Sequence, residues 1–193
     1  MIYFKDNFLS KTLFDELNSK LINFEKIDME GGCVLYVVKS TEELTSYFEK
    51  EIERIEGKSI EMIMCGFRRS KHDEDNEWRI HSDLKVHQDQ KSNPERAGVL
   101  YMSEVPEDVK SKLNGTAFWD HNEYGDNNEG SLEIHNKALE VCDDLSKWTL
   151  KSIIGHKPNR FLSYDSNYFH SKYPNVTKED RIVCVMFYRY KNE

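Results

Sequence analysis

From residue 60 onward, the sequence is dominated by short runs of β-branched and aromatic residues separated by polar loops. Runs of this kind are typical of β-strands. Only one amphipathic segment of helical length lies between them, so the pattern indicates an antiparallel sandwich or barrel. We expect seven strands: IEMIMCGF (60–67), WRIHSD (78–83), AGVLYM (97–102), GTAFWD (115–120), WTLKSII (148–154), RFLSYD (160–165) and RIVCVMFYRY (181–190).

Two amphipathic helices are expected before these strands. The first begins after Ser10, whose hydroxyl can accept an amide hydrogen bond at a helix N-terminus. Its apolar positions recur at helical spacing: Leu13, Phe14, Leu17 and Leu21. The second opens with Ser40 and Glu43 at the spacing of a capping box. Its apolar positions are Leu44, Phe48, Ile52 and Ile55. Helices gathered ahead of the strands argue against a Rossmann-type fold, in which the two alternate.

The length of 193 residues favours one domain with a substantial core. We expect residues 1–58 to form a helical support region and residues 59–193 to form the β-rich core. A segment at 132–145 has a helical pattern and lies in a long insertion around 120–158. The expected class is therefore mainly β, with N-terminal helices.

The charge of the chain constrains its partners. Asp and Glu number 35 against 27 Lys and Arg, which gives a formal net charge of −8. Non-specific binding to phosphate backbones requires clustered cations, so nucleic acid is disfavoured as a partner. No apolar run is long enough to cross a bilayer. The four cysteines lie far apart without a CxxC pair, so we expect a reduced, cytoplasmic protein without a disulfide framework.

The motif His81-Ser82-Asp83 is the first candidate for chemistry. On a strand, side chains two residues apart project from the same face, so an imidazole and a carboxylate here could bind one ion. The spacing recurs at His87 and Asp89. We prefer the first pair because a strand-like Trp-Arg-Ile precedes it, whereas a polar run follows the second.

A third ligand and an anchoring cation are found later in the chain. His170 follows a predicted strand and would complete a set of two histidines and one carboxylate, which leaves one face of an octahedral Fe(II) open. Arg181 begins the last strand, where an inward-pointing guanidinium could pair bidentately with one end of a dicarboxylic acid.

In this order the segments resemble the iron(II)- and 2-oxoglutarate-dependent oxygenases, within them the prolyl-hydroxylase-like branch. The resemblance covers nearly the whole chain. It rests on Asp6–Ser10 (DNFLS), His81-x-Asp83, Ala97–Met102, Gly115–Phe118, Asn159-Arg160-Phe161 leading to His170-Ser171, and Asp180-Arg181. The sequence departs from the family pattern at Asn114-Gly115, where many members have two glycines, and in its longer 120–158 region.

The resemblance implies a double-stranded β-helix, the cupin-like jelly roll, with the metal at the open end of two sheets. It implies that His81, Asp83 and His170 bind Fe(II), and that Arg181, with Tyr101 as the nearest candidate tyrosine, binds the distal carboxylate of 2-oxoglutarate. It further implies a dioxygenase, in most cases a hydroxylase. Such an enzyme uses O2 to convert 2-oxoglutarate to succinate while it oxidises a second substrate, a protein side chain or a small molecule.

Three alternatives remain open. One is an oxygenase that acts on a nucleic-acid base, against which the acidic composition counts. The other two use the same jelly roll differently. A metal-dependent hydrolase would activate water on a three-ligand ion and would not need Arg181. A non-catalytic binding or structural domain would tolerate substitution of all three ligand candidates without losing any metal-dependent property.

Overall fold

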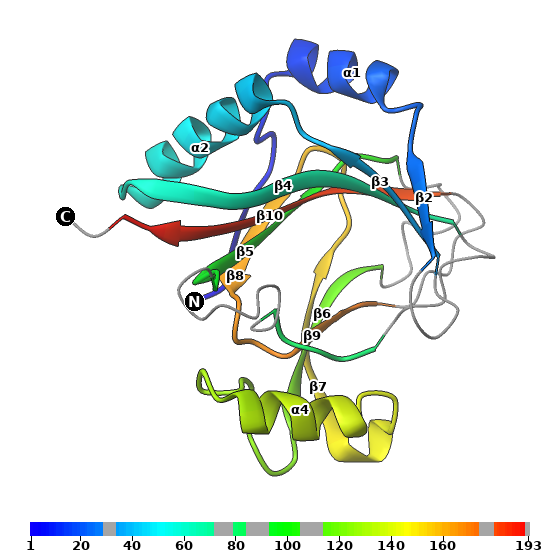
Figure 1. The fold of residues 1–193 in the computed structure, drawn as a ribbon, viewed down its shortest axis with the longest axis vertical. Helices are drawn as coiled ribbons and strands as arrows, with labels where there is room; N and C mark the ends of the chain where they lie inside the picture. Colours follow the sequence, from blue (N-terminus) through cyan, green and yellow to red (C-terminus); the bar gives the residue numbers. More distant parts are fainter. Residues whose placement is uncertain (29–33, 72–78, 84–92, 105–113, 174–179, 192–193) are drawn as a thin grey trace.

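The computed structural model describes residues 1–28, 34–71, 79–83, 93–104, 114–173 and 180–191. Its strands form two antiparallel sheets that pack face to face (Figure 1). The strands are β1 (Tyr3–Lys5), β2 (Glu25–Asp28), β3 (Val34–Lys39), β4 (Ile60–Ser70), β5 (Arg96–Tyr101), β6 (Gly115–His121), β7 (Trp148–Gly155), β8 (Phe161–Asp165), β9 (His170–Lys172) and β10 (Arg181–Tyr190). The helices are α1 (Lys11–Lys20), α2 (Glu42–Glu56), α4 (Leu132–Glu140) and the short 3₁₀ turn η2 (Leu145–Lys147).

The larger sheet has seven strands in the order β1-β8-β5-β10-β4-β3-β2, and the smaller has three in the order β7-β6-β9. The expected jelly-roll architecture is confirmed. Six of the seven expected strands form at or near their predicted positions. The segment 78–83 does not form a strand: of its described residues, His81 makes only an isolated antiparallel bridge with His170.

The first 58 residues contain both expected helices and, in addition, the strands β1, β2 and β3, which join the larger sheet. The predicted cap of α1 is confirmed, because the Ser10 side chain accepts a hydrogen bond from the Leu13 amide. The cap of α2 lies one residue later than predicted. Thr41, not Ser40, accepts from the Leu44 amide, since adjacent hydroxyl residues compete for one capping position.

Side chains of strand β10 point alternately to the two faces of the larger sheet and so contribute to two separate hydrophobic clusters. Cys184, Met186 and Tyr188 belong to a cluster with Phe48 of α2, while Val183 and Phe187 face the smaller sheet. Helices α1 and α2 thus cover the outer face of the larger sheet, and α4 lies beyond the smaller one (Figure 1). A third cluster joins Ala138 of α4 to strand β6.

Within the described ranges, no helix is both long and apolar enough to span a membrane.

Candidate metal centre

Three side chains predicted as ligands lie together at one end of the two sheets. His81, Asp83 and His170 each place one ligand atom within 4.8 Å of the others. Backbone pairing holds them there. The amide of His81 donates to the carbonyl of His170 at 2.9 Å, and the amide of His170 returns a bond of 2.8 Å. The amide of Asp83 donates to the carbonyl of Ser166 at 2.8 Å.

Backbone carbonyls orient both imidazoles in the same way. Nδ1 of His81 lies 2.8 Å from the carbonyl oxygen of Arg79, and Nδ1 of His170 lies 2.9 Å from that of Tyr168. A carbonyl can only accept, so each Nδ1 carries a proton and each Nε2 offers its lone pair. Those Nε2 atoms face Asp83, at 3.9 Å for His81 and 3.5 Å for His170. This is the orientation in which protein histidines bind metals.

The electrostatics of the cluster fit a cation. Burial raises the pKa of Asp83 to about 6, although His81 partly offsets the effect. Burial lowers the pKa of His170 to about 4, so its imidazole is neutral at pH 7. Among the described residues, Oδ2 of Asp83 is buried without a hydrogen-bond partner. A buried carboxylate oxygen that faces two imidazole lone pairs is strongly disfavoured unless a positive ion lies between them.

Arg181 lies near the cluster and next to Tyr101. Its guanidinium is 5.5 Å from the centre of the Tyr101 ring, and the Tyr101 hydroxyl is 2.8 Å from Oγ1 of Thr116. Tyr101 is fully buried, and burial raises its pKa. His156, which the sequence reasoning did not single out, also packs against Tyr101, with ring centres 4.6 Å apart. The structure thus brings Arg181, Tyr101 and Thr116 together.

A second layer of polar residues supports the loop between the ligands, and sequence reasoning missed it. The Ser82 hydroxyl lies 2.7 Å from Nδ1 of His135 on α4, and the side-chain amide of Asn128 donates from Nδ2 to that hydroxyl at 2.7 Å. All three side chains are buried. Ser82 has no motif of its own, and His135 lies 53 residues away in the chain, so no local pattern could have paired them.

The competing pair His87 and Asp89 lies outside the described residues.

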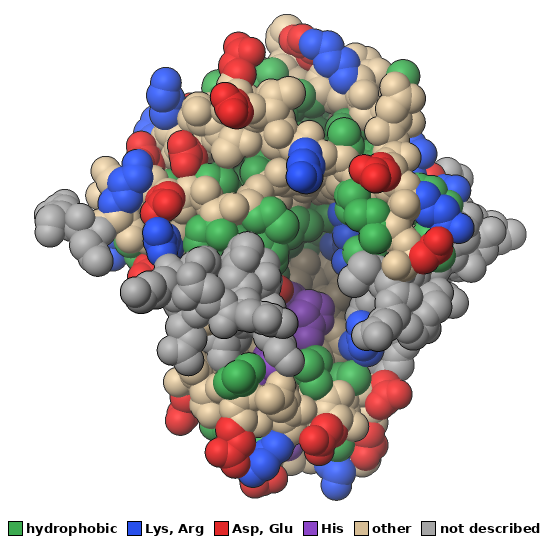
Figure 2. Space-filling model, in the orientation of Figure 1, with side chains coloured by type: hydrophobic (Ala, Val, Ile, Leu, Met, Phe, Trp, Pro, Cys, Tyr) green, Lys and Arg blue, Asp and Glu red, His purple; other side chains and the backbone are tan. Residues whose placement is uncertain are grey.

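A cavity of about 440 Å³ opens beside the three ligand candidates. It lies between the sheets, and its lining includes His81, Asp83, His170, Thr116 and Arg181. Figure 2 shows histidine side chains at the bottom of a hollow that has apolar and cationic groups on its upper wall. Its volume falls within the range of about 300–1,000 Å³ that is typical of small-molecule sites.

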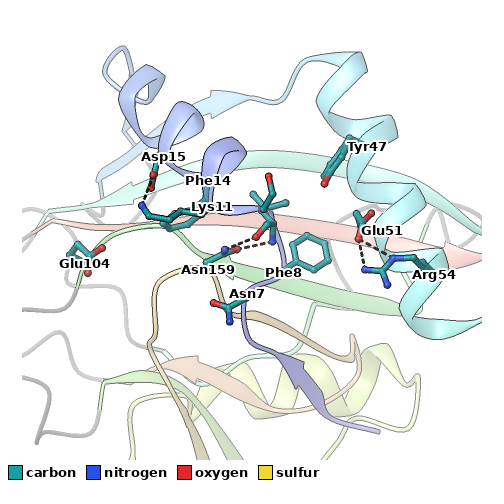
Figure 3. Close-up of a pocket in the computed structure, with 12 residues that line it drawn as sticks. Asn7, Phe8, Lys11, Phe14, Asp15, Tyr47, Glu51, Arg54, Glu104 and Asn159 are labelled. Carbon is teal, nitrogen blue, oxygen red and sulfur yellow. Dashed lines mark hydrogen bonds and ion pairs between the residues drawn. The ribbon is translucent and has the colours of Figure 1, made fainter.

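A second pocket, about 640 Å³ in volume, lies between the N-terminal segment, α1 and α2 (Figure 3). Four of its five charged side chains pair with each other, Lys11 with Asp15 and Arg54 with Glu51. The Asn159 side chain bonds both the amide and the carbonyl of Leu9 at 2.8 Å. Two segments of the family resemblance, 6–10 and 159–161, therefore contact each other here in a structural role.

No protein-family model matches the sequence, and no curated protein matches it significantly. Solved structures do match. The non-heme alpha-ketoglutarate-dependent epimerase SnoN from nogalamycin biosynthesis aligns over 97% of this chain and 76% of its own, with a TM-score of 0.65 and 10% identity.

Two further enzymes have the same architecture. HygX from Streptomyces hygroscopicus, solved with nickel, 2-oxoglutarate and hygromycin B bound, aligns over 97% of this chain and 82% of its own, with a TM-score of 0.63 and 11% identity. A Pseudomonas putida prolyl-4-hydroxylase aligns over 98% of this chain and 92% of its own, with a TM-score of 0.60 and 11% identity. The chain therefore has the fold of the 2-oxoglutarate-dependent oxygenases, the double-stranded β-helix expected from the sequence.

Proposed function

We propose that this protein is an Fe(II)- and 2-oxoglutarate-dependent dioxygenase that hydroxylates a second substrate. The observation that supports this most is the meeting of His81, Asp83 and His170, with ligand atoms within 4.8 Å of one another, in the cavity that also contains Arg181. Two imidazoles and one carboxylate on one side of an ion are typical of non-haem Fe(II) oxygenases. The fold is one in which related architectures bind 2-oxoglutarate.

Each residue has a defined task in this proposal. Nε2 of His81, Nε2 of His170 and the carboxylate of Asp83 hold the ion. Arg181 pairs bidentately with the far carboxylate of 2-oxoglutarate. The hydroxyls of Tyr101 and Thr116 lie beside it, 2.8 Å from each other, and because one proton serves their mutual hydrogen bond, one is left to donate to that carboxylate. Arg181 also meets the requirement that separates an oxygenase from a jelly-roll hydrolase, which needs no dicarboxylate anchor.

In this proposal, the apolar side chains around the cluster exclude water from it. Val99, Val183 and Tyr164 line the cavity next to the ligand candidates, and an apolar wall strengthens the electrostatic interactions of the groups that it encloses. When bound, Fe(II) and 2-oxoglutarate supply the oxidative chemistry, in which O2 converts 2-oxoglutarate to succinate and carbon dioxide and hydroxylates the substrate.

The test is an anaerobic titration of metal-free protein with Fe(II) and then with 2-oxoglutarate, followed by visible absorption. We expect the weak charge-transfer band of an iron-chelated keto acid. Asp83→Ala should abolish the band, and Arg181→Ala should shift its appearance to much higher 2-oxoglutarate concentrations. A folded wild-type protein that gives no band would overturn the proposal.

Two broader assignments belong to the same proposal. We infer one oxygenase domain over residues 1–193, since both the N-terminal strands and β10 belong to the larger sheet. A cytoplasmic location fits Cys65 and Cys184, whose sulfur atoms lie 3.7 Å apart without a disulfide bond, because reducing compartments keep cysteines as thiols.

A further inference from the structure

The cavity extends well beyond the ligand cluster, along the inner face of the larger sheet. Its floor is arranged in rows that cross the strands. One row aligns Val183, Arg68 and Val37, and continues into the fully buried Tyr101 beyond the cavity lining. The next row aligns Val99, Val185, Gly66 and Lys39, and a third pairs Met64 with Phe187. Side chains in register on neighbouring strands share one face, so these rows form a continuous surface.

Gly66 leaves a depression in the middle of this surface. A Cβ atom at Gly66 would meet only the Val38 carbonyl oxygen, at 3.4 Å, and the Lys39 Cα, at 4.0 Å. The space above the strand is therefore open to a side chain or a ligand. Val185 and Lys39 flank Gly66 in its row, while Phe187 and Met64 bound it along the strands. Met64 keeps 38% of its surface exposed, so the apolar floor is open to a ligand.

The charge of the cavity is opposite to that of the chain. Its described lining contains five cationic side chains and one carboxylate, Asp83, which leaves four positive charges in excess. The cations are Lys39, Arg68, Arg79, Lys172 and Arg181. Four of them, all except Lys39, make further interactions within the protein, so the preference for an anion comes from the excess of cations and from Lys39. Bound Fe(II) and 2-oxoglutarate carry opposite charges of equal size, so they would leave this excess unchanged.

The cavity has an apolar floor and an excess of positive charge. From these two properties, and on the basis of the proposed function, we infer that the prime substrate is a small organic anion with an apolar body. The body lies over Gly66, Val185 and Phe187, and a carboxylate or phosphate group pairs with Lys39 and Arg68. Cationic side chains at the edge of an apolar site favour such ligands and repel cations. The volume of about 440 Å³ suits a small molecule rather than a folded protein surface.

The test compares probes that share one hydrocarbon chain. Decanoate, decyl phosphate, decanol and decyltrimethylammonium are titrated by calorimetry, below their micelle concentrations, into anaerobic protein loaded with Fe(II) and 2-oxoglutarate. We expect both anions to bind at least about tenfold more tightly than decanol, and the cation to bind more weakly than decanol. The two anions separate carboxylate from phosphate recognition.

Three variants locate the site. Lys39→Glu should weaken the binding of both anions by about tenfold and leave the affinity for decanol unchanged. Lys50→Glu, the same charge change on the exposed side of α2, should leave all probes unchanged. Gly66→Leu should fill the depression and weaken the binding of every probe, while the visible band of iron-chelated 2-oxoglutarate stays intact.

The outcomes separate this inference from the proposed function. Equal binding of decanol and the anions, no binding of any probe, or an unaltered Gly66→Leu profile would overturn the inference while the band still supports the oxygenase. Absence of the band would overturn the proposed function. The probes would then be titrated into metal-free protein, where the response to Lys39→Glu still decides the anion preference.

Discussion

Asp83 is the residue whose protonation most directly controls the proposed centre. Burial raises its pKa to about 6, so in metal-free protein the carboxyl group is largely protonated below that pH. An ion must then displace this proton. His170 adds no such competition above about pH 5, because burial lowers its pKa to about 4.

We therefore predict that Fe(II) affinity is nearly constant above about pH 7 and falls by about tenfold per pH unit below about pH 6. Anaerobic Fe(II) titrations between about pH 5 and pH 8 measure this. An affinity at pH 5 equal to that at pH 7 would show that Asp83 is not a ligand or is not buried in solution.

Arg181 offers a second test at the scale of one residue. Arg181→Lys keeps the charge but removes the bidentate geometry, so we predict that the Kd for 2-oxoglutarate rises roughly 30-fold, equivalent to about 2 kcal/mol. Fe(II) affinity should not change. Arg189→Lys, on the same strand and paired with Glu61 at the surface, is the matched control. If both variants bind 2-oxoglutarate like wild type, Arg181 is not the anchor.

The candidate ligands could be predicted from sequence because their spacing reflects local geometry and an ordered resemblance. His81 and Asp83 are two residues apart, and Arg181 opens a strand with a clear alternating pattern. Ser82, His135 and His156 could not be predicted in this way. Their roles depend on contacts between segments far apart in the chain, and no short motif encodes such contacts.

At the scale of elements, helix α4 braces the ligand loop through His135 and Ser82. We predict that His135→Ala weakens Fe(II) binding about 10- to 100-fold, the range usual for residues that support metal ligands, with a smaller effect on the midpoint of urea unfolding. Lys137→Ala, on the same helix and paired only with the surface residue Glu133 in the described structure, should leave Fe(II) binding unchanged. Equal Fe(II) affinity in the two variants would show that α4 does not support the metal ligands.

The last residue of helix α2 adds a buried polar contact with the larger sheet. Glu56 accepts hydrogen bonds from the hydroxyls of Tyr3 and Tyr190 at 2.5 Å and from that of Tyr188. The Glu56 side chain is only 4% exposed. Removing it leaves three donors without their acceptor, which is costly where water cannot replace it.

We predict that Glu56→Ala lowers the free energy of unfolding by about 2–4 kcal/mol. Glu43→Ala, an exposed change in the first turn of the same helix, should cost less than about 1 kcal/mol. Urea unfolding measures both. A loss for Glu56→Ala as small as that for Glu43→Ala would mean that the tyrosine hydroxyls find other partners.

The elements that could be predicted are those with strong local signals. Helices α1 and α2 have apolar faces and caps, and β10 has a long alternating pattern. Strands β1 and β9 have only three residues each, and their conformation is set by pairing with β8 and β6. The segment 78–83 has a strand-like composition, but only His81 among its described residues finds a bridge partner.

At the scale of the whole molecule, the decisive feature is the order of strands in the larger sheet. It places β10 between β4 and β5, so that Arg181 and the first two rows of the cavity floor lie on adjacent strands. No single segment of the sequence determines this strand order. The class of fold could be predicted because the strands and the family resemblance agreed. The added strands β2 and β3, of which β3 widens the cavity floor, could not.

Whether His81, Asp83 and His170 hold one metal ion beside Arg181 can be seen in a crystal structure of the protein with Mn(II), a redox-stable substitute for Fe(II), and 2-oxoglutarate, with the ion identified by anomalous scattering. We predict one ion within about 2.0–2.3 Å of Nε2 of His81, Nε2 of His170 and a carboxylate oxygen of Asp83. The far carboxylate of 2-oxoglutarate should contact Arg181. An ion held by His87 and Asp89 would contradict the assigned ligands, and a 2-oxoglutarate remote from Arg181 would contradict the assigned anchor.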